Sequence, residues 1–311
     1  MQDSDRSDSS EIVRFDDTRP GHWPEPFQSV EILSPMDGEL QKAWYFPCSG
    51  GEKRPLLVSL HTWGGDYNQN DPLAPLAVKE NWNYIHPDFR GPNRTAKACC
   101  SEFALDDIDQ AIDFAIKQGN VDPDRIYVNG VSGGGYAALA LYMRSRHHIR
   151  SISAWVPISD LAAWYKQSVI RGATNYAENI IRCTGSQNNV LNIEEAKARS
   201  PIFWDVPGRD TRLHIYAGVF DGIQGSVPIT QSINFYNKLV ADLGAVDEKS
   251  QVSVEEKAWL LEHRMPSVAM GEIGDRKICL QKQFKTIDLI IFEGNHEMLI
   301  DVAYHNILQD L

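Results

Sequence analysis

Residues 127–138 read Tyr-Val-Asn-Gly-Val-Ser-Gly-Gly-Gly-Tyr-Ala-Ala, and this stretch decides the fold. A β-branched run leads into Gly-x-Ser-x-Gly with Ser132 at its centre, and an Ala/Leu-rich helical pattern follows from Gly135 to Arg144. A strand, a tight turn and a helix in this order form a nucleophile elbow, in which the serine takes a strained backbone geometry. Gly130 and Gly134 are small enough for the strand and the helix to cross closely. The stretch therefore predicts a nucleophile at Ser132, and the alternative is a glycine-rich loop with an idle serine.

Short apolar runs recur along the chain and predict the strands of a sheet. A nearly continuous run such as Pro55–Leu60 is typical of a strand that is covered on both faces of a parallel sheet. Helical patterns separate these runs, and the clearest begins at Ser101 and ends at Gly119. Strands that alternate with helices predict an α/β fold with a doubly wound, mostly parallel sheet. The other predicted strands are 82–89, 125–129, 151–157, 213–218 and 287–292.

The N-terminal part of the chain has a different pattern. Residues 27–46 hold two apolar runs on either side of Asp37-Gly38, and Asp-Gly is a strong signal for the turn of an antiparallel hairpin. Residues 1–20 are polar, and we expect them to be disordered. Residues 21–311 are then expected to form a single domain.

Two segments depart from the alternation of strands and helices. Residues 161–200 show no strand pattern and are expected to form a helical or irregular cover over the site. A helix is predicted from about Pro228 to Leu243. After it, residues 244–283 form a charged insertion with a predicted helix at 254–262.

The composition excludes some classes of partner. A net charge of −12 and the lack of a Lys/Arg cluster argue against nucleic acid. No apolar stretch reaches the roughly 18 residues that a membrane span requires, so no membrane partner is expected. The N-terminus has no basic-then-apolar signal, but a polar tract also follows a removed secretion signal. The compartment and the oligomeric state therefore stay open.

The cysteines predict neither a metal site nor a disulfide framework. Their number is odd and their spacing is not that of metal ligands. Adjacent Cys99 and Cys100 cannot bridge each other without strain. We expect mostly buried thiols, and no metal or cofactor. The five residues are Cys48, Cys99, Cys100, Cys183 and Cys279.

Three polar residues that follow predicted strands suggest a hydrolytic site. A serine hydroxyl needs a base to take its proton, and the base needs a third group to hold its tautomer. Ligands of open α/β sheets bind beyond the carboxyl ends of the strands. Ser132, Asp221 and His296 each come directly after a strand, so the fold is expected to bring them together at one edge as nucleophile, acid and base.

Other residues compete for two of these roles. His61 also follows a strand, but it precedes the nucleophile and fits a loop-shaping role better. Asp160 follows the strand at 151–157 and is the alternative acid. An Asp-Gly turn is the structural alternative for Asp221.

A tetrahedral oxyanion needs two preorganised N–H donors. One is expected from the backbone of Gly133, directly after the nucleophile and at the start of a helix. The other is expected from the loop at residues 61–65, with Trp63 as the first choice. A plain strand-to-helix turn is the alternative reading of this loop.

These motifs together resemble the α/β-hydrolase superfamily, and within it the prolyl oligopeptidase-like catalytic domains and the related acetyl xylan or polyester esterases. The resemblance covers roughly residues 55–305. It implies a nucleophile at Ser132, an acid at Asp221, a base at His296 and oxyanion donors at Trp63 and Gly133. The residues that carry it are 61–65, Val121-Asp122-Pro123-Asp124-Arg125, 130–134, Asp221 with Val227-Pro228, and 294–296.

The sequence also departs from the peptidase pattern. The loop from Asp221 to Val227-Pro228 is longer than usual, Asn295 stands where a second glycine is common, and the insertion at 244–283 is unusual. We therefore expect a serine hydrolase that cleaves carboxylic esters through an acyl-enzyme, with a small-molecule or acylated carbohydrate substrate. The alternatives are a serine peptidase of the prolyl oligopeptidase-like type and, from another class, a non-catalytic hydrolase-like binding protein.

Overall fold

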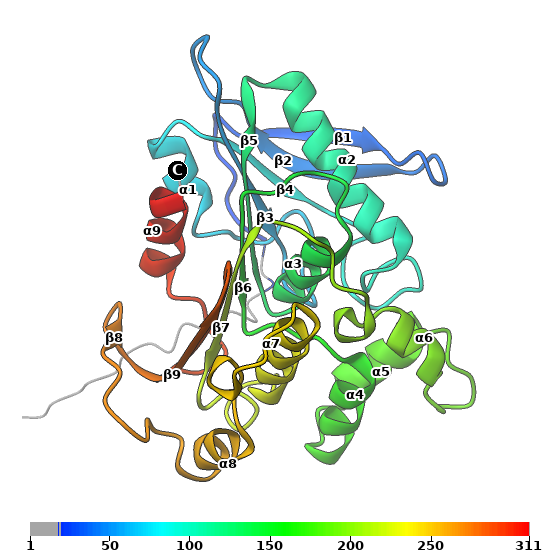
Figure 1. Ribbon diagram of the computed structural model, residues 1–311. Coiled ribbons are helices and arrows are strands. Elements are labelled where there is room, and N and C mark those ends of the chain that lie inside the picture. Colours follow the sequence, from blue (N-terminus) through cyan, green and yellow to red (C-terminus); the bar gives the residue numbers. More distant parts are fainter. Residues whose placement is uncertain (1–17, 19, 311) are drawn as a thin grey trace, which may run out of the picture.

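The computed structural model describes residues 18 and 20–310, so the prediction of disorder at residues 1–20 falls almost wholly outside the described residues. The described chain is built on a ten-stranded sheet with the strand order β1-β2-β4-β3-β5-β6-β7-β10-β9-β8 (Figure 1). The strands are β1 (Gln28–Leu33), β2 (Leu40–Phe46), β3 (Arg54–Leu60), β4 (Asn83–Pro87), β5 (Val121–Val131), β6 (Ser151–Trp155), β7 (Arg212–Gly218), β8 (Glu272–Ile273), β9 (Arg276–Phe284) and β10 (Ile287–Phe292).

The middle of the sheet is parallel, as the alternating pattern predicts. Strands β4, β3, β5, β6, β7 and β10 pair in parallel. The predicted N-terminal hairpin is β1 and β2, which joins the sheet by antiparallel pairing of β2 with β4. Parallel strands place all their carboxyl ends at one edge, and this edge is where the polar motifs lie.

Near the end of the sheet farthest from the hairpin lies a strand that the sequence analysis misses. Strand β9 pairs antiparallel with β10 inside the segment expected to be a charged insertion. Its sequence is Arg-Lys-Ile-Cys-Leu-Gln-Lys-Gln-Phe, and only Ile278, Cys279 and Leu280 are buried. Charged side chains are typical of strands near a sheet edge, where they prevent further pairing, and they hide the strand signal.

Helices cover both faces of the sheet. One hydrophobic cluster lies under α2, α3 and α7, and a second lies under α1 and α9. Helices α4, α5 and α6 occupy the predicted cover segment, and α8 lies in the insertion (Figure 1). The short helix α1 has no counterpart in the sequence analysis. The helices are α1 (Ala74–Lys79), α2 (Glu102–Gln118), α3 (Gly133–Arg144), α4 (Leu161–Ile170), α5 (Thr174–Cys183), α6 (Ile193–Ala198), α7 (Thr230–Asp242), α8 (Val254–His263) and α9 (Ile300–Asp310).

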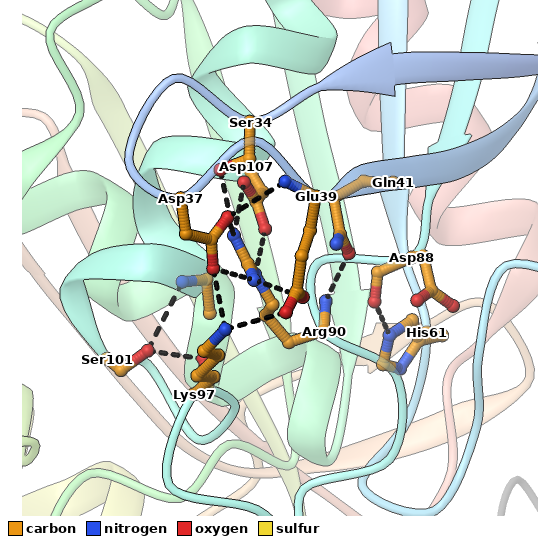
Figure 2. A network of polar contacts seen from close by, with 11 residues as sticks. Ser34, Asp37, Glu39, Gln41, His61, Asp88, Arg90, Lys97, Ser101 and Asp107 are labelled. Carbon is orange, nitrogen blue, oxygen red and sulfur yellow. Dashed lines mark hydrogen bonds and ion pairs between the residues drawn. The ribbon is translucent and has the colours of Figure 1, made fainter.

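A buried arginine ties the hairpin turn to helix α2 (Figure 2). The guanidinium of Arg90 donates to Asp37 at 2.7 Å, to Glu39 at 2.8 Å and to Asp107 at 2.5 Å. Its side chain is 3% exposed and that of Asp107 is 1% exposed. Burial raises the pKa of Asp107, although the bond to Arg90 opposes this shift. The loop that follows β4 is therefore anchored on both sides, and one of its residues, Asn93, donates its backbone N–H to Trp63 O at 2.9 Å.

Replacing Arg90 by Ala should destabilise the fold, because Asp107 would stay buried without its cation. The expected loss in the free energy of unfolding is about 3 to 5 kcal/mol. Urea titration would measure it, with the exposed Arg94→Ala change in the same loop as the control. The double change Arg90→Ala, Asp107→Asn should recover part of the loss. An Arg90→Ala protein as stable as the parent would contradict this account.

A second buried charge network joins the sheet to helix α9. His214 of β7 lies between two carboxylates, with Nδ1 at 3.1 Å from Asp288 and Nε2 at 3.3 Å from Asp310. Burial favours the neutral ring, but the hydrogen bonds to Asp288 and Asp310 outweigh it and raise the pKa of His214 to about 9. The imidazolium therefore helps to dock α9 at neutral pH.

Replacing His214 by Gln should destabilise the protein in a pH-dependent way. The folded-state pKa near 9 lies above the unfolded value of about 6.5, so the stabilisation is complete below about pH 6.5 and is lost as the pH rises through about 9. The free energy of unfolding should fall by on the order of 2 to 3 kcal/mol at about pH 6.5, and by much less at about pH 10. Urea unfolding of both proteins across this range would test it. A loss that does not change with pH would show that His214 acts through packing alone.

Candidate active site

The turn between β5 and α3 holds Ser132 in a strained conformation. Its φ is 58° and its ψ is −114°, which non-glycine residues rarely adopt. A Cβ added at Gly130 would lie 2.2 Å from the backbone oxygen of Gly134, so strand and helix cross too closely for any larger residue. The backbone N–H of Ser132 donates to Trp155 O of β6 at 2.9 Å. The strand, tight turn and helix predicted around Ser132 are all present.

Asp221 and His296 meet at the same edge of the sheet, although 75 residues separate them in the chain. The Nδ1 atom of His296 lies 2.7 Å from Oδ2 of Asp221. Asp221 is 1% exposed and His296 is 6% exposed. Because the carboxylate accepts at Nδ1, it fixes the ring tautomer in which Nε2 can take a proton.

The loop after β7 wraps around the Asp221 carboxylate. Oδ1 of Asp221 accepts the backbone N–H of Gly222 at 2.8 Å and that of Val227 at 3.0 Å. A Cβ added at Gly225 would lie 2.2 Å from Oδ1 of Asp221 and 2.5 Å from Cβ of His296. Residues 221–227, named the acid loop below, therefore close directly over the Asp221–His296 pair.

The acid loop also brings a second serine to the histidine. Oγ of Ser226 lies 3.3 Å from Nε2 of His296, the nitrogen that the proposed base would use. Trp164 Nε1 of α4 donates to the backbone oxygen of Ser226 at 2.9 Å, and this bond holds the serine in place. The sequence analysis misses Ser226, because neither its spacing nor its neighbours distinguish it from other loop serines.

The alternative acid and the alternative histidine have other contacts. Asp160 caps helix α4, where its side chain accepts the N–H of Ala163 at 2.9 Å. The two ring nitrogens of His61 lie 2.9 and 2.7 Å from the backbone oxygens of Thr62 and Asp88, and its ring stacks on Phe89 at 3.8 Å. The contact with Asp88 is drawn in Figure 2. His61 thus joins the loop after β3 to the loop after β4, which agrees with the expected loop-shaping role.

The expected oxyanion donors lie side by side. A Cβ added at Gly133 would lie 2.3 Å from the backbone nitrogen of Trp63, so these two segments touch through their backbones. Within residues 20–310, neither backbone N–H donates to another protein group. Gly133 is also the first residue of α3, where N–H groups point toward an anion. The arrangement suits a negatively charged oxygen near Ser132.

Aromatic side chains pack behind these donors. The rings of Trp63 and Trp164 meet edge to face at 4.7 Å, and Tyr176 lies 5.0 Å from Trp164. Trp63 is 3% exposed and Trp164 is fully buried. These two rings serve packing between the sheet and the cover, and they are not a surface on which a sugar ring could stack.

The described residues give no sign of a metal or membrane site. All five cysteines are buried and free. Between residues 20 and 310, no three His, Cys, Asp or Glu side chains are arranged to hold a metal ion. None of the helices in this part of the chain has the length and apolar character that crossing a bilayer requires.

Comparison with known proteins assigns the chain to a family. The family model described as "Prolyl oligopeptidase family" matches residues 94–260, which is more than half of the chain. The chain belongs to the prolyl oligopeptidase family. It is thus a member of a serine hydrolase family, and the matched residues include Ser132, Asp221 and the cover segment.

Solved structures show the same fold. An acylaminoacyl peptidase from Pyrococcus horikoshii is 18% identical with a TM-score of 0.60, and the match covers 91% of this chain and 40% of that one. Dipeptidyl peptidase 4 from Porphyromonas gingivalis is 19% identical with a TM-score of 0.55, covering 70% of this chain and 30% of that one. The fold is therefore that of the α/β-hydrolases, as the resemblance implies.

The curated relatives match this chain over only part of their length. The uncharacterized protein YfhR of Escherichia coli (strain K12) is 28% identical over 137 residues, which are 42% of this chain and 48% of that protein. YfhR of Salmonella typhimurium is 27% identical over 123 residues, 38% of this chain and 42% of that protein. The chain thus spans less than half the length of the curated relatives it matches.

The two candidate acids can be separated by matched substitutions. Asp221→Asn should lower kcat by about 10⁴, because the amide no longer holds His296 in the required tautomer. Asp160→Asn should change kcat little, since Asn caps a helix about as well as Asp. Both variants keep the size of the side chain, and circular dichroism would check that they fold. If Asp160→Asn were the slower variant, the acid would have to be reassigned.

Proposed function

We propose that this protein is a serine peptidase that cleaves short peptides through an acyl-enzyme. The bond between Asp221 and His296, at the sheet edge where the strained turn also holds Ser132, is the observation that carries the proposal. Membership of the prolyl oligopeptidase family and the peptidases among the similar structures favour peptides over the esters predicted from the sequence.

The geometry suits a two-step reaction. Nδ1–H of His296 donates to Asp221, so Nε2 can take the proton of Ser132 as its oxygen attacks the carbonyl carbon. The N–H groups of Trp63 and Gly133 would stabilise the oxyanion of the tetrahedral intermediate. The imidazolium then gives its proton to the leaving amine, which departs and leaves an acyl-enzyme. Water, activated by the same histidine, releases the acid and restores Ser132.

Hydrolysis of carboxylic esters is the second candidate. The same nucleophile, base and oxyanion donors act on an ester, which has a better leaving group than an amide. The long acid loop from Asp221 to Val227-Pro228 departs from the peptidase pattern, and for this reason ester substrates are included in the test below. The buried Trp63 and Trp164 do not support the more specific expectation of an acylated carbohydrate.

The test combines one variant with a matched set of substrates. Ser132→Ala should lower kcat by about 10⁴-fold or more, because the acyl-enzyme can no longer form. The exposed Ser267→Ala change is the control and should leave turnover unchanged. A fluorophosphonate probe should label the parent at Ser132, as mapped by mass spectrometry of the digest.

The substrates decide between the two candidates. Peptidyl anilides and acetyl or feruloyl esters would be assayed on the same purified sample. Faster turnover of the anilides, relative to their rates in water, would support the peptidase, and activity on esters alone would favour the second candidate. A folded Ser132→Ala protein with parental turnover of either substrate would overturn both.

A further inference from the structure

Arg171 lies on the rim of the candidate site, at the C-terminal end of helix α4. Its Nη2 donates to the backbone oxygen of Gly225 at 2.6 Å and, more weakly, to that of Ile223 at 3.4 Å. Its Nη1 donates to the backbone oxygen of Ser226 at 3.3 Å. All three acceptors belong to the acid loop. The guanidinium is therefore held in one place by neutral carbonyl groups.

The position of these carbonyls puts the charge close to the proposed base. Gly225 packs against both members of the Asp221–His296 pair, and Ser226 hydrogen-bonds to His296 itself. Arg171 thus contacts the residues that touch the histidine directly. The guanidinium therefore lies one residue away from the proposed base, on the outer side of the acid loop.

Arg171 has no carboxylate partner among residues 20–310. Other arginines pair with acids, such as Arg125 with Asp122 at 2.8 Å and Arg199 with Glu195 at 2.7 Å. Arg171 forms no ion pair with any carboxylate in the part of the chain that the structure describes, although the whole sequence carries a net charge of −12. It is exposed, and a guanidinium has five N–H donors, more than these three bonds use. The remaining N–H groups can donate to an anion.

We propose that Arg171 is a specificity residue that binds a carboxylate group of the substrate. Bonds from a guanidinium to a carboxylate are charge-assisted and about twice as strong as neutral ones, and Arg171 still has Nε–H and one Nη1–H to donate. The carboxylate belongs either to the acyl side of the scissile bond or to the C-terminus on the leaving-group side. This inference rests on the proposed hydrolase function of the same site.

The neighbours of Arg171 indicate the rest of the ligand. Ile170 precedes Arg171 in the chain and is 85% exposed, and Ile223, whose backbone oxygen accepts from Arg171, is 60% exposed. An apolar group next to the carboxylate would cover these side chains. A peptide with apolar residues and one nearby carboxylate therefore fits this rim best.

Matched substrates test the proposal by kinetics. Succinyl and methoxysuccinyl peptidyl anilides differ only in a carboxylate on the acyl side, and peptide acids and peptide amides differ only in one on the leaving-group side. Arg171→Gln should lower kcat/KM for the anionic member of one pair by about tenfold or more relative to the neutral member, because any slowing that acts through the acid loop affects both members equally. The pair that responds identifies the side that carries the carboxylate. Arg182→Gln, an exposed arginine of α5 that pairs with Glu178, is the control.

A loop-positioning role would give a different result. If Arg171 only anchors the acid loop, Arg171→Gln should slow both members of each pair equally, and this would overturn the proposal. No change in either pair would overturn it as well. Arg171→Lys should retain part of the preference for the anion, because a point charge remains but the planar guanidinium and its fixed donors are lost.

A binding measurement separates this proposal from the proposed function. Calorimetry would compare N-acetylphenylalanine with its amide on the parent and on Arg171→Gln. One outcome is a parent protein that binds the acid more tightly than the amide, with this preference absent in Arg171→Gln, and yet hydrolyses no substrate. That result would support the role of Arg171 and overturn the proposed hydrolase. Turnover without any preference for the acid, in kinetics and in binding, would overturn Arg171 and keep the hydrolase.

Discussion

The close crossing of β5 and α3 at Ser132 is the constraint on which the site depends. Strand β5 and helix α3 can cross closely because Gly130 has no side chain, and Ser132 at this crossing has a positive φ. Gly134 in turn lets α3 approach the end of β3 at Leu60. The strain is of the order of 1 to 3 kcal/mol, and it must be compensated by the surrounding packing. Helix α3 supplies this packing, because nearly all of its residues are buried between the sheet and α2. The conformation that holds Ser132 at the sheet edge is therefore maintained by the hydrophobic core.

The acid loop links this core to the cover helices. Asp221 receives two backbone N–H bonds from its own loop, so its carboxylate is oriented before it meets His296. Helix α4 holds the outer side of the same loop through Trp164 and Arg171. A displacement of α4 would move the backbone of Ser226, and with it the hydroxyl group on His296. The cover is thus mechanically connected to the proposed base, and it does more than shield the site from water.

The sequence predicts the sheet and the three polar residues because these depend on local patterns. Each of the residues Ser132, Asp221 and His296 follows an apolar run, and parallel pairing of those runs brings them to one edge. This pattern leaves Asp160 as an alternative to Asp221, because both follow a strand. Their different contacts arise from the path of the loops, since one loop turns back over the carboxylate and the other enters a helix that the carboxylate caps.

The contacts of Ser226 and Arg171 have no local signal at all. Ser226 meets His296 across 70 residues, and Arg171 meets Gly225 across 54. Most of their partners are backbone carbonyls, which every residue has, so no residue type at a fixed spacing announces them. Strand β9 is missed for another reason. Lys and Gln at its more exposed positions mask the pattern of its few buried apolar residues. The contacts of Ser226 and Arg171 therefore become visible only when the tertiary structure is known.

The N-terminal hairpin contributes to the site without touching it. Arg90 binds the hairpin turn at Asp37 and helix α2 at Asp107, and so fixes the loop after β4 (Figure 2). That loop holds the segment that contains the expected oxyanion donor Trp63, because the backbone N–H of Asn93 donates to the backbone oxygen of Trp63. Donors that are fixed in advance stabilise a developing charge without a cost of reorganisation during the reaction. The ion pairs of the hairpin therefore bear on the rate of the proposed reaction through the rigidity of the Trp63 backbone.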